Sequence, residues 1–104
     1  MQAVVDQYEM ASFEAMYARF GSEPFDLIID DGLHSIGSNL NTLIFALEHV
    51  KPGGVIVIED IGAEKVAHWR VVDMILRQGR SAQELDTYLV DCAGQKLYVV
   101  ERNM

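Results

Sequence analysis

The sequence predicts an α/β fold with a mostly parallel sheet and helices mainly on one face. Residues 25–29 and 55–58 are short apolar runs, which are typical of strands buried on both faces. Between these runs, apolar residues recur with helical spacing, at Ile36, Leu40, Leu43, Ile44, Leu47 and Val50. Strand, helix and strand in this order form a βαβ unit with a right-handed crossover. Residues 85–91 and 96–102 read as an antiparallel hairpin around a short loop.

The other predicted elements come from local signals. Residues 3–5 form a possible first strand, after which Asp6 is expected to cap the next element or to contact a ligand. Helical spacing predicts helices over about 9–20, 36–50 and 63–78. Ser35 is the expected N-cap of the second helix, with Ser38 as the alternative, and Gly79 is expected to end the third. Pro52 and the two glycines after it predict the turn between helix and strand.

Length, composition and charge limit the classes of protein to which this sequence can belong. The 104 residues suit a single domain, 1–104, and half of them are hydrophobic. A net charge of −8 and a pI near 4.6 argue against a nucleic-acid partner, which selects a basic surface. No apolar run reaches transmembrane length, so no membrane partner is expected. With Cys92 as the single cysteine, the sequence favours a reducing, cytoplasmic location.

Acidic residues follow both central strands at the point where each strand ends. Asp30 and Asp31 end the first strand, while Glu59 and Asp60 end the second. Because parallel strands place their carboxyl ends at one edge, about 4.8 Å apart, these carboxylates and His34 are expected to converge there. The mutual repulsion of the carboxylates would be relieved by a hard divalent cation. The alternative is a plain turn, which an Asp-Asp-Gly sequence also favours.

The segments IIDDGLHS and KPGGVIVIEDI carry a family resemblance. They resemble the metal-dependent sugar O-methyltransferases of macrolide biosynthesis and, more loosely, the cephalosporin-hydroxylase-like group, which are class I S-adenosylmethionine-dependent methyltransferases. The resemblance implies a Rossmann-like fold, with Asp31, Glu59 and Asp60 as Mg²⁺ ligands and His34 as general base. The upstream VVDQ resembles the family's third strand and its acidic end, which makes Asp6 a weak cofactor-binding candidate.

Relative to that family, the chain has only part of the pattern. Class I methyltransferases hold S-adenosylmethionine with a glycine-rich loop after their first strand and an acidic residue after the second. No such loop precedes Val4, and Gly53-Gly54 stands between a helix and a strand, which is the wrong context. We therefore expect a truncated methyltransferase fold.

Two functions remain open. The first is the metal and base half of a sugar O-methyltransferase site, with a small-molecule substrate and with S-adenosylmethionine bound only if another chain supplies the missing half. The second is a non-catalytic, self-associating binding or structural module. Topology also predicts a homodimer, because the expected helices share one sheet face and leave the other apolar and bare. The bare face is expected to include Ile28, Ile56 and Ile58.

Overall fold

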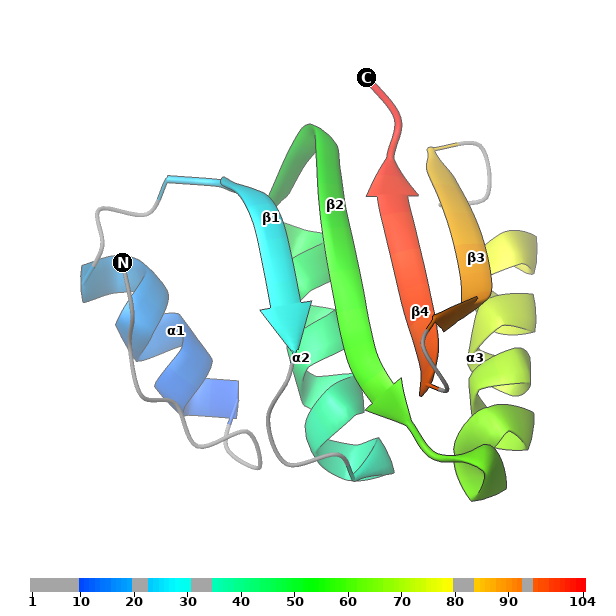
Figure 1. The fold of residues 1–104 in the computed structure, drawn as a ribbon. Coiled ribbons are helices and arrows are strands. Elements are labelled where there is room, and N and C mark those ends of the chain that lie inside the picture. The colour runs from blue at the N-terminus through cyan, green and yellow to red at the C-terminus, as the bar shows by residue number, and fades with distance from the viewer. Residues whose placement is uncertain (1–9, 20–22, 31–34, 80–83, 93–94) are drawn as a thin grey trace.

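The computed structural model describes residues 10–19, 23–30, 35–79, 84–92 and 95–104. These residues form a four-stranded sheet in the order β1-β2-β4-β3, with α2 and α3 behind it and α1 beside β1 (Figure 1). A 3-10 turn, Ala63–Lys65, links β2 to α3. The helices and strands are α1 (Met10–Arg19), β1 (Phe25–Asp30), α2 (Ile36–His49), β2 (Val50–Ile61), α3 (Val66–Gln78), β3 (Leu85–Cys92) and β4 (Gln95–Arg102).

The predicted βαβ unit and hairpin are confirmed. β1 and β2 are parallel and joined through α2, while β3 pairs with β4 in an antiparallel ladder. β4 also lies antiparallel to β2, so the C-terminal hairpin and the parallel pair form one sheet. The additional parallel strand expected at 3–5 lies outside the described residues. None of the described helices has the length and apolarity needed to cross a membrane.

Local chemistry explains where α2 starts and how it turns into β2. Ser35 is the N-cap, and its hydroxyl accepts a hydrogen bond from the Ser38 backbone N–H at 3.2 Å. Beyond the helix, Gly53 has a φ of +83°, which residues with a side chain rarely adopt. A Cβ on Gly54 would lie 2.6 Å from a methyl group of Val50. The turn therefore requires both glycines, as predicted.

The buried face of α2 differs from the predicted stripe. Ile44 is half exposed, whereas Thr42 and Phe45 are buried. The reason is that α2 packs against two neighbours: the sheet on one side and α1 on the other, where the Phe13 and Phe45 ring centroids lie 5.1 Å apart. Thr42 is tolerated there because its hydroxyl donates a hydrogen bond to the Ser38 backbone carbonyl.

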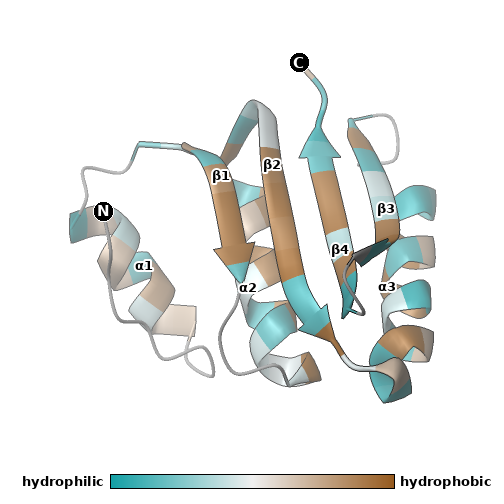
Figure 2. Ribbon diagram, in the orientation of Figure 1, coloured by the Kyte–Doolittle hydropathy of each residue, from teal (hydrophilic) through white to brown (hydrophobic). Residues whose placement is uncertain are grey.

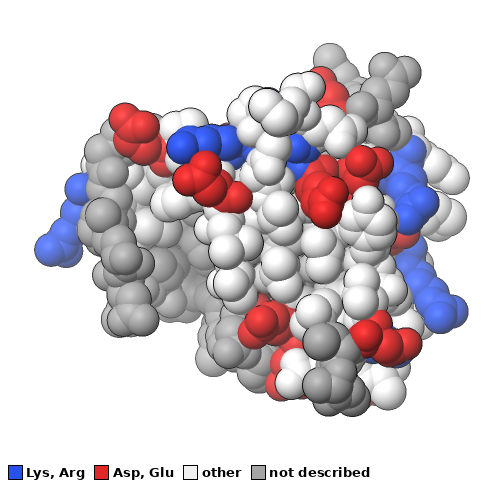
Figure 3. Space-filling model, turned by 45° about the horizontal axis from the view of Figure 1, so that its top comes forward, with Lys and Arg blue, Asp and Glu red and all other residues white. Residues whose placement is uncertain are grey.

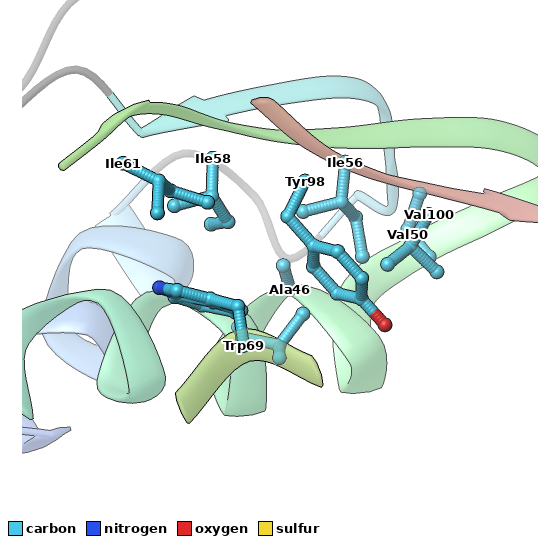
Figure 4. Packing of buried hydrophobic residues seen from close by; sticks show 9 residues of the cluster. Ala46, Val50, Ile56, Ile58, Ile61, Trp69, Tyr98 and Val100 are labelled. Carbon is cyan, nitrogen blue, oxygen red and sulfur yellow. The ribbon is translucent and has the colours of Figure 1, made fainter. Parts of the chain in front are cut away.

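A continuous core fills the space between the sheet and the two helices behind it (Figure 4). Trp69 of α3 is fully buried and packs against Tyr98 of β4, with ring centroids 5.2 Å apart. Trp69 is thus a packing residue of the core. The buried members of this core are Leu43, Ala46, Val50, Ile56, Ile58, Ile61, Trp69, Tyr98 and Val100.

Among the described residues, no helix covers the other sheet face (Figure 1), and this uncovered face is the opposite one from the face predicted to be bare. Ile56 and Ile58 have no exposed surface because α2 and α3 cover them. Leu27 and Ile29, by contrast, are 55% and 53% exposed. Apolar residues fill the middle of β1, β2 and β4 (Figure 2). We call this surface the open sheet face; following the strand register, it comprises Leu27, Ile29, Val55, Val57, Tyr88, Val90, Leu97 and Val99.

Candidate functional site

The structure brings the carboxyl ends of β1 and β2 together, as the sequence predicted. Asp30, the last residue of β1, pairs with Ile58 of β2 and is buried. The chain continues from Ile58 directly into Glu59, which is partly exposed, and Asp60, which is exposed. We call this edge the acidic edge. Three predicted site residues lie outside the described residues: Asp6, Asp31 and His34.

The two acids of β2 lie on a β-bulge. Ile58 pairs with Tyr98 and Ile61 with Lys96, so β2 has one residue more than β4 across this interval. Asp60 absorbs the irregularity with a φ of 56°, and it is the one described residue other than glycine with a positive φ. This left-handed conformation costs an L-residue about 1–2 kcal/mol, although aspartate tolerates it better than most. Such strain is concentrated at functional sites.

Helix N-termini are directed toward the same edge. α2 begins near the end of β1, and α3 begins shortly after β2 ends, so both helices start at the carboxyl edge of the sheet (Figure 1). The positive end of each helix dipole therefore faces the acidic edge. A positive helix end favours anionic side chains near it.

Buried polar groups lie in the first turns of these two helices, and the sequence reasoning missed them. Asn39 is 1% exposed, and neither atom of its side-chain amide has a hydrogen-bond partner within the described structure. The same holds for the indole Nε1 of the buried Trp69. An unpaired buried amide costs about 1–3 kcal/mol, so it calls for a functional or structural reason. The available signal was a polar residue beside the apolar stripe of α2.

A second polar cluster joins α3 to the β3–β4 hairpin. The carboxylate of Asp73 accepts hydrogen bonds from the Thr87 hydroxyl at 2.5 Å, the Tyr98 hydroxyl at 2.8 Å and the Arg77 guanidinium at 2.8 Å. Partial burial by itself raises the pKa of Asp73, but these hydrogen bonds and the Arg77 charge outweigh it and lower the pKa. Burial and the neighbouring Asp73 carboxylate raise the pKa of the Tyr98 phenol. The Thr87 and Tyr98 hydroxyls and the Arg77 guanidinium all donate hydrogen bonds to the Asp73 carboxylate, so we assign this cluster the role of holding the hairpin against α3.

Between the acidic edge and the Asp73 cluster, the acidic edge is the candidate for cation binding. Its described side chains are carboxylates, which in ionised form only accept hydrogen bonds or bind cations. Oxygen ligands of this kind suit Mg²⁺ or Ca²⁺. The strand order and the acidic carboxyl edge define a Rossmann-like α/β protein.

Residues 1–61 match the family model described as a methyltransferase domain. The match covers more than half of the 104 residues. The chain belongs to this methyltransferase domain family.

Two curated proteins are similar to this chain and confirm the resemblance to the macrolide sugar O-methyltransferases. Demethylmacrocin O-methyltransferase from Streptomyces fradiae is 43% identical over 67 residues, and mycinamicin VI 2''-O-methyltransferase from Micromonospora griseorubida is 42% identical over 65 residues. These segments cover 64% and 62% of this chain but 15% of each relative.

Solved structures confirm the truncated Rossmann-like fold. The MycE methyltransferase from the mycinamycin biosynthetic pathway, in complex with Mg, SAH and mycinamycin VI, matches with a TM-score of 0.71 at 21% identity. The match covers 99% of this chain and 31% of that one. An rRNA methylase from Streptococcus thermophilus matches with a TM-score of 0.57 at 19% identity, over 89% of this chain and 55% of that one. The chain thus spans only part of the length of these relatives.

Proposed function

We propose that this chain provides the metal- and base-bearing part of a sugar O-methyltransferase site. The observation that carries the proposal is the strained acidic bulge of β2, which lies beside the carboxyl end of the parallel strand β1. The two curated relatives are O-methyltransferases, and the MycE structures hold Mg and SAH. Both facts support extending the assignment from the family to this particular chemistry.

The residues of the acidic edge fit a divalent cation of the magnesium type. Asp31, Glu59 and Asp60 would hold it, because all three offer the oxygen donors that such ions prefer. The left-handed backbone at Asp60 is a cost that a plain strand end would avoid, which favours a binding role for this residue. When bound, the cation would act as a Lewis acid that orients an acceptor hydroxyl and stabilises its alkoxide.

His34 is the proposed general base. Its place in the sequence, three residues after Asp31, puts it in the loop that follows β1. A histidine imidazole has a pKa near neutral pH, so it accepts a proton from a sugar hydroxyl without a strongly basic site. The methyl group would come from S-adenosylmethionine. Asp6 is the weak candidate within this chain for a contact with that cofactor.

Mg²⁺ titration followed by thermal unfolding tests the metal site. Preferential binding to the folded state should raise the melting temperature, by about 4–8 °C per kcal/mol of binding linkage in a domain of this size. Asp60→Asn should remove most of this shift while leaving the unbound melting temperature nearly unchanged, since asparagine also tolerates a positive φ. Asp86→Asn, at an exposed position of β3, is the matched control. An equal Mg²⁺ shift in all three proteins, or none in the wild type, would refute the site.

The open sheet face favours a second function, self-association. Tyr88 and Val90 of β3 are 44% and 39% exposed, in addition to the half-exposed residues of β1. Monomeric proteins rarely leave a contiguous apolar surface of this extent uncovered. The middle of the face is uncharged, and acidic groups stand at both ends of it (Figure 3). We propose that a second copy of this chain covers it in a two-fold homodimer.

Charge makes the self-association testable. Two copies, each with a net charge of −8, repel one another, whereas the apolar contact is insensitive to screening. Dimerisation measured by sedimentation should therefore strengthen as salt rises. Leu27→Gln with Ile29→Gln should weaken it, and the matched pair Ile44→Gln with Ile75→Gln, at similarly exposed helix positions, should not. A well-folded wild-type monomer at micromolar concentration would contradict the dimer.

Three expectations stay predictions. The net charge of −8 argues against a nucleic-acid partner. The single cysteine favours a cytoplasmic location. The small-molecule substrate follows from the proposed chemistry.

A further inference from the structure

A cluster of metal-ligating side chains lies between α1 and α2, away from the residues of the acidic edge. His49, the last residue of α2, directs Nε2 toward Glu14 of α1, whose Oε1 lies 3.4 Å away. A carboxylate oxygen of Glu48 lies 3.9 Å from the same nitrogen. One ligand atom from each of the three residues lies within 4.8 Å of the other two.

These distances are close to those of a tetrahedral metal site. Zinc binds imidazole nitrogen and carboxylate oxygen at about 2.0–2.2 Å, which places neighbouring ligands of a tetrahedron roughly 3.3–3.6 Å apart. The separation of 3.4 Å between His49 and Glu14 already falls in this range, while it is long for a hydrogen bond. The carboxylate of Glu48 lies 3.9 Å from the imidazole and within 4.8 Å of the Glu14 carboxylate, so it needs a shift of up to about 1 Å, which an exposed side chain can make.

Packing holds the imidazole in place, which distinguishes it from a freely rotating surface histidine. The His49 side chain is 15% exposed. Its ring centroid lies 3.9 Å from that of Tyr17 on α1 and 4.6 Å from that of Phe45 on α2. The ring is therefore fixed between the two helices while Nε2 faces the carboxylates. A ligand held in the binding orientation before the metal arrives loses less entropy on binding.

We propose that Glu14, Glu48 and His49 bind a divalent transition-metal ion, with Zn²⁺ as the best fit. Two carboxylates and one imidazole supply three ligands, and water completes the tetrahedron. An imidazole nitrogen in the set favours Zn²⁺, Ni²⁺ or Cu²⁺ over Mg²⁺, which prefers an all-oxygen set. Because Glu14 belongs to α1 and the other two ligands to α2, the bound ion fastens α1 to the rest of the domain. This proposal does not depend on the proposed methyltransferase chemistry.

Titration calorimetry and thermal unfolding of the 104-residue chain with Zn²⁺ test the proposal. Zn²⁺ should raise the melting temperature of the wild type by about 5 °C or more once it saturates the folded state. Glu14→Gln and Glu48→Gln are surface changes that leave the fold intact, and each should weaken Zn²⁺ binding by about tenfold or more. His49→Gln should abolish it. Co²⁺, a spectroscopic substitute, should show tetrahedral visible absorption in the wild type, need a higher concentration to do so in the two glutamate variants, and show none in His49→Gln.

Two controls separate this site from the acidic edge and from non-specific binding to an acidic protein. In Asp60→Asn, Zn²⁺ should still raise the melting temperature, whereas Mg²⁺ should not. In Glu84→Gln, which changes an exposed residue distant in sequence from both sites, both ions should still raise it. Zn²⁺ binding unaffected by Glu14→Gln and His49→Gln would overturn the proposal. So would a Zn²⁺ response that disappears in Asp60→Asn, or no Zn²⁺ binding by the wild type.

Discussion

At the scale of single residues, Asp73 shows how one carboxylate organises three elements. It accepts hydrogen bonds from α3, β3 and β4 at once, through Arg77, Thr87 and Tyr98. Arg77 also donates to the Thr87 backbone carbonyl at 2.9 Å, so the guanidinium reaches both α3 and β3. Hydrogen bonds to an ionised group are worth more than neutral ones, about 1.5–3 kcal/mol. The hairpin is therefore fastened to α3 by polar contacts as well as by the core.

We expect Asp73→Asn to lower the free energy of unfolding at pH 7 by about 1–3 kcal/mol, since the buried Tyr98 hydroxyl loses a charged acceptor. The pKa of Asp73 is lowered in the fold, so its contribution is present above the unfolded-state value of 3.8 and is lost as pH falls through the folded value. The penalty of the substitution should shrink accordingly below about pH 4. Urea denaturation at pH 7 and pH 3 measures both effects, with Asp86→Asn as control. A penalty that is independent of pH would contradict the assigned role.

At the scale of elements, substitutions in the β2 bulge measure the cost of its strained backbone separately from metal binding. Asp60 alone carries the left-handed backbone among the described residues other than glycine, while Glu59 beside it does not. Asp60→Val should therefore destabilise the fold by about 1–2 kcal/mol, because a β-branched side chain clashes at a φ of 56°. Asp60→Gly should be neutral or slightly stabilising, since glycine adopts this conformation freely.

Glu59→Val is the control for the Asp60 series, since it places the same side chain at a position without a positive φ. The comparison is made by urea denaturation without added metal. Equal losses for Asp60→Val and Glu59→Val would show that the backbone at Asp60 is not strained.

At the scale of the whole molecule, the match to the MycE methyltransferase covers 99% of this chain and 31% of that one. The sequence of this chain has no glycine-rich loop ahead of Val4 and no ribose-binding acid after a preceding strand. We expect the purified 104-residue chain not to bind S-adenosylmethionine appreciably, with or without Mg²⁺. Titration calorimetry decides the matter, and a micromolar Kd would show that Asp6 and its neighbours hold the cofactor without the missing elements.

Much of the fold was predictable because its signals are local. The apolar runs predicted β1 and the centre of β2, and Ser35 predicted the start of α2. The two glycines predicted the turn that leads from α2 into the centre of β2. The position of the acidic strand ends was predictable for the same reason: Asp30 ends β1 and pairs with Ile58 of β2, one residue before Glu59. Predictions for Asp31 and His34 remain predictions, since both lie outside the described residues.

The sequence by itself determined the helices and strands, their order and the family, because residue propensity, apolar spacing and motifs depend on residues that are close together in the chain. Only the tertiary structure decided which sheet face is covered: alternation defines two faces, and helix packing places Ile56 and Ile58 inside while Leu27 remains outside. It also decided the strain at Asp60, which arises from the mismatch between β2 and β4. The cluster of Glu14 with His49 likewise depends on how α1 packs against α2, a contact across 35 residues of sequence.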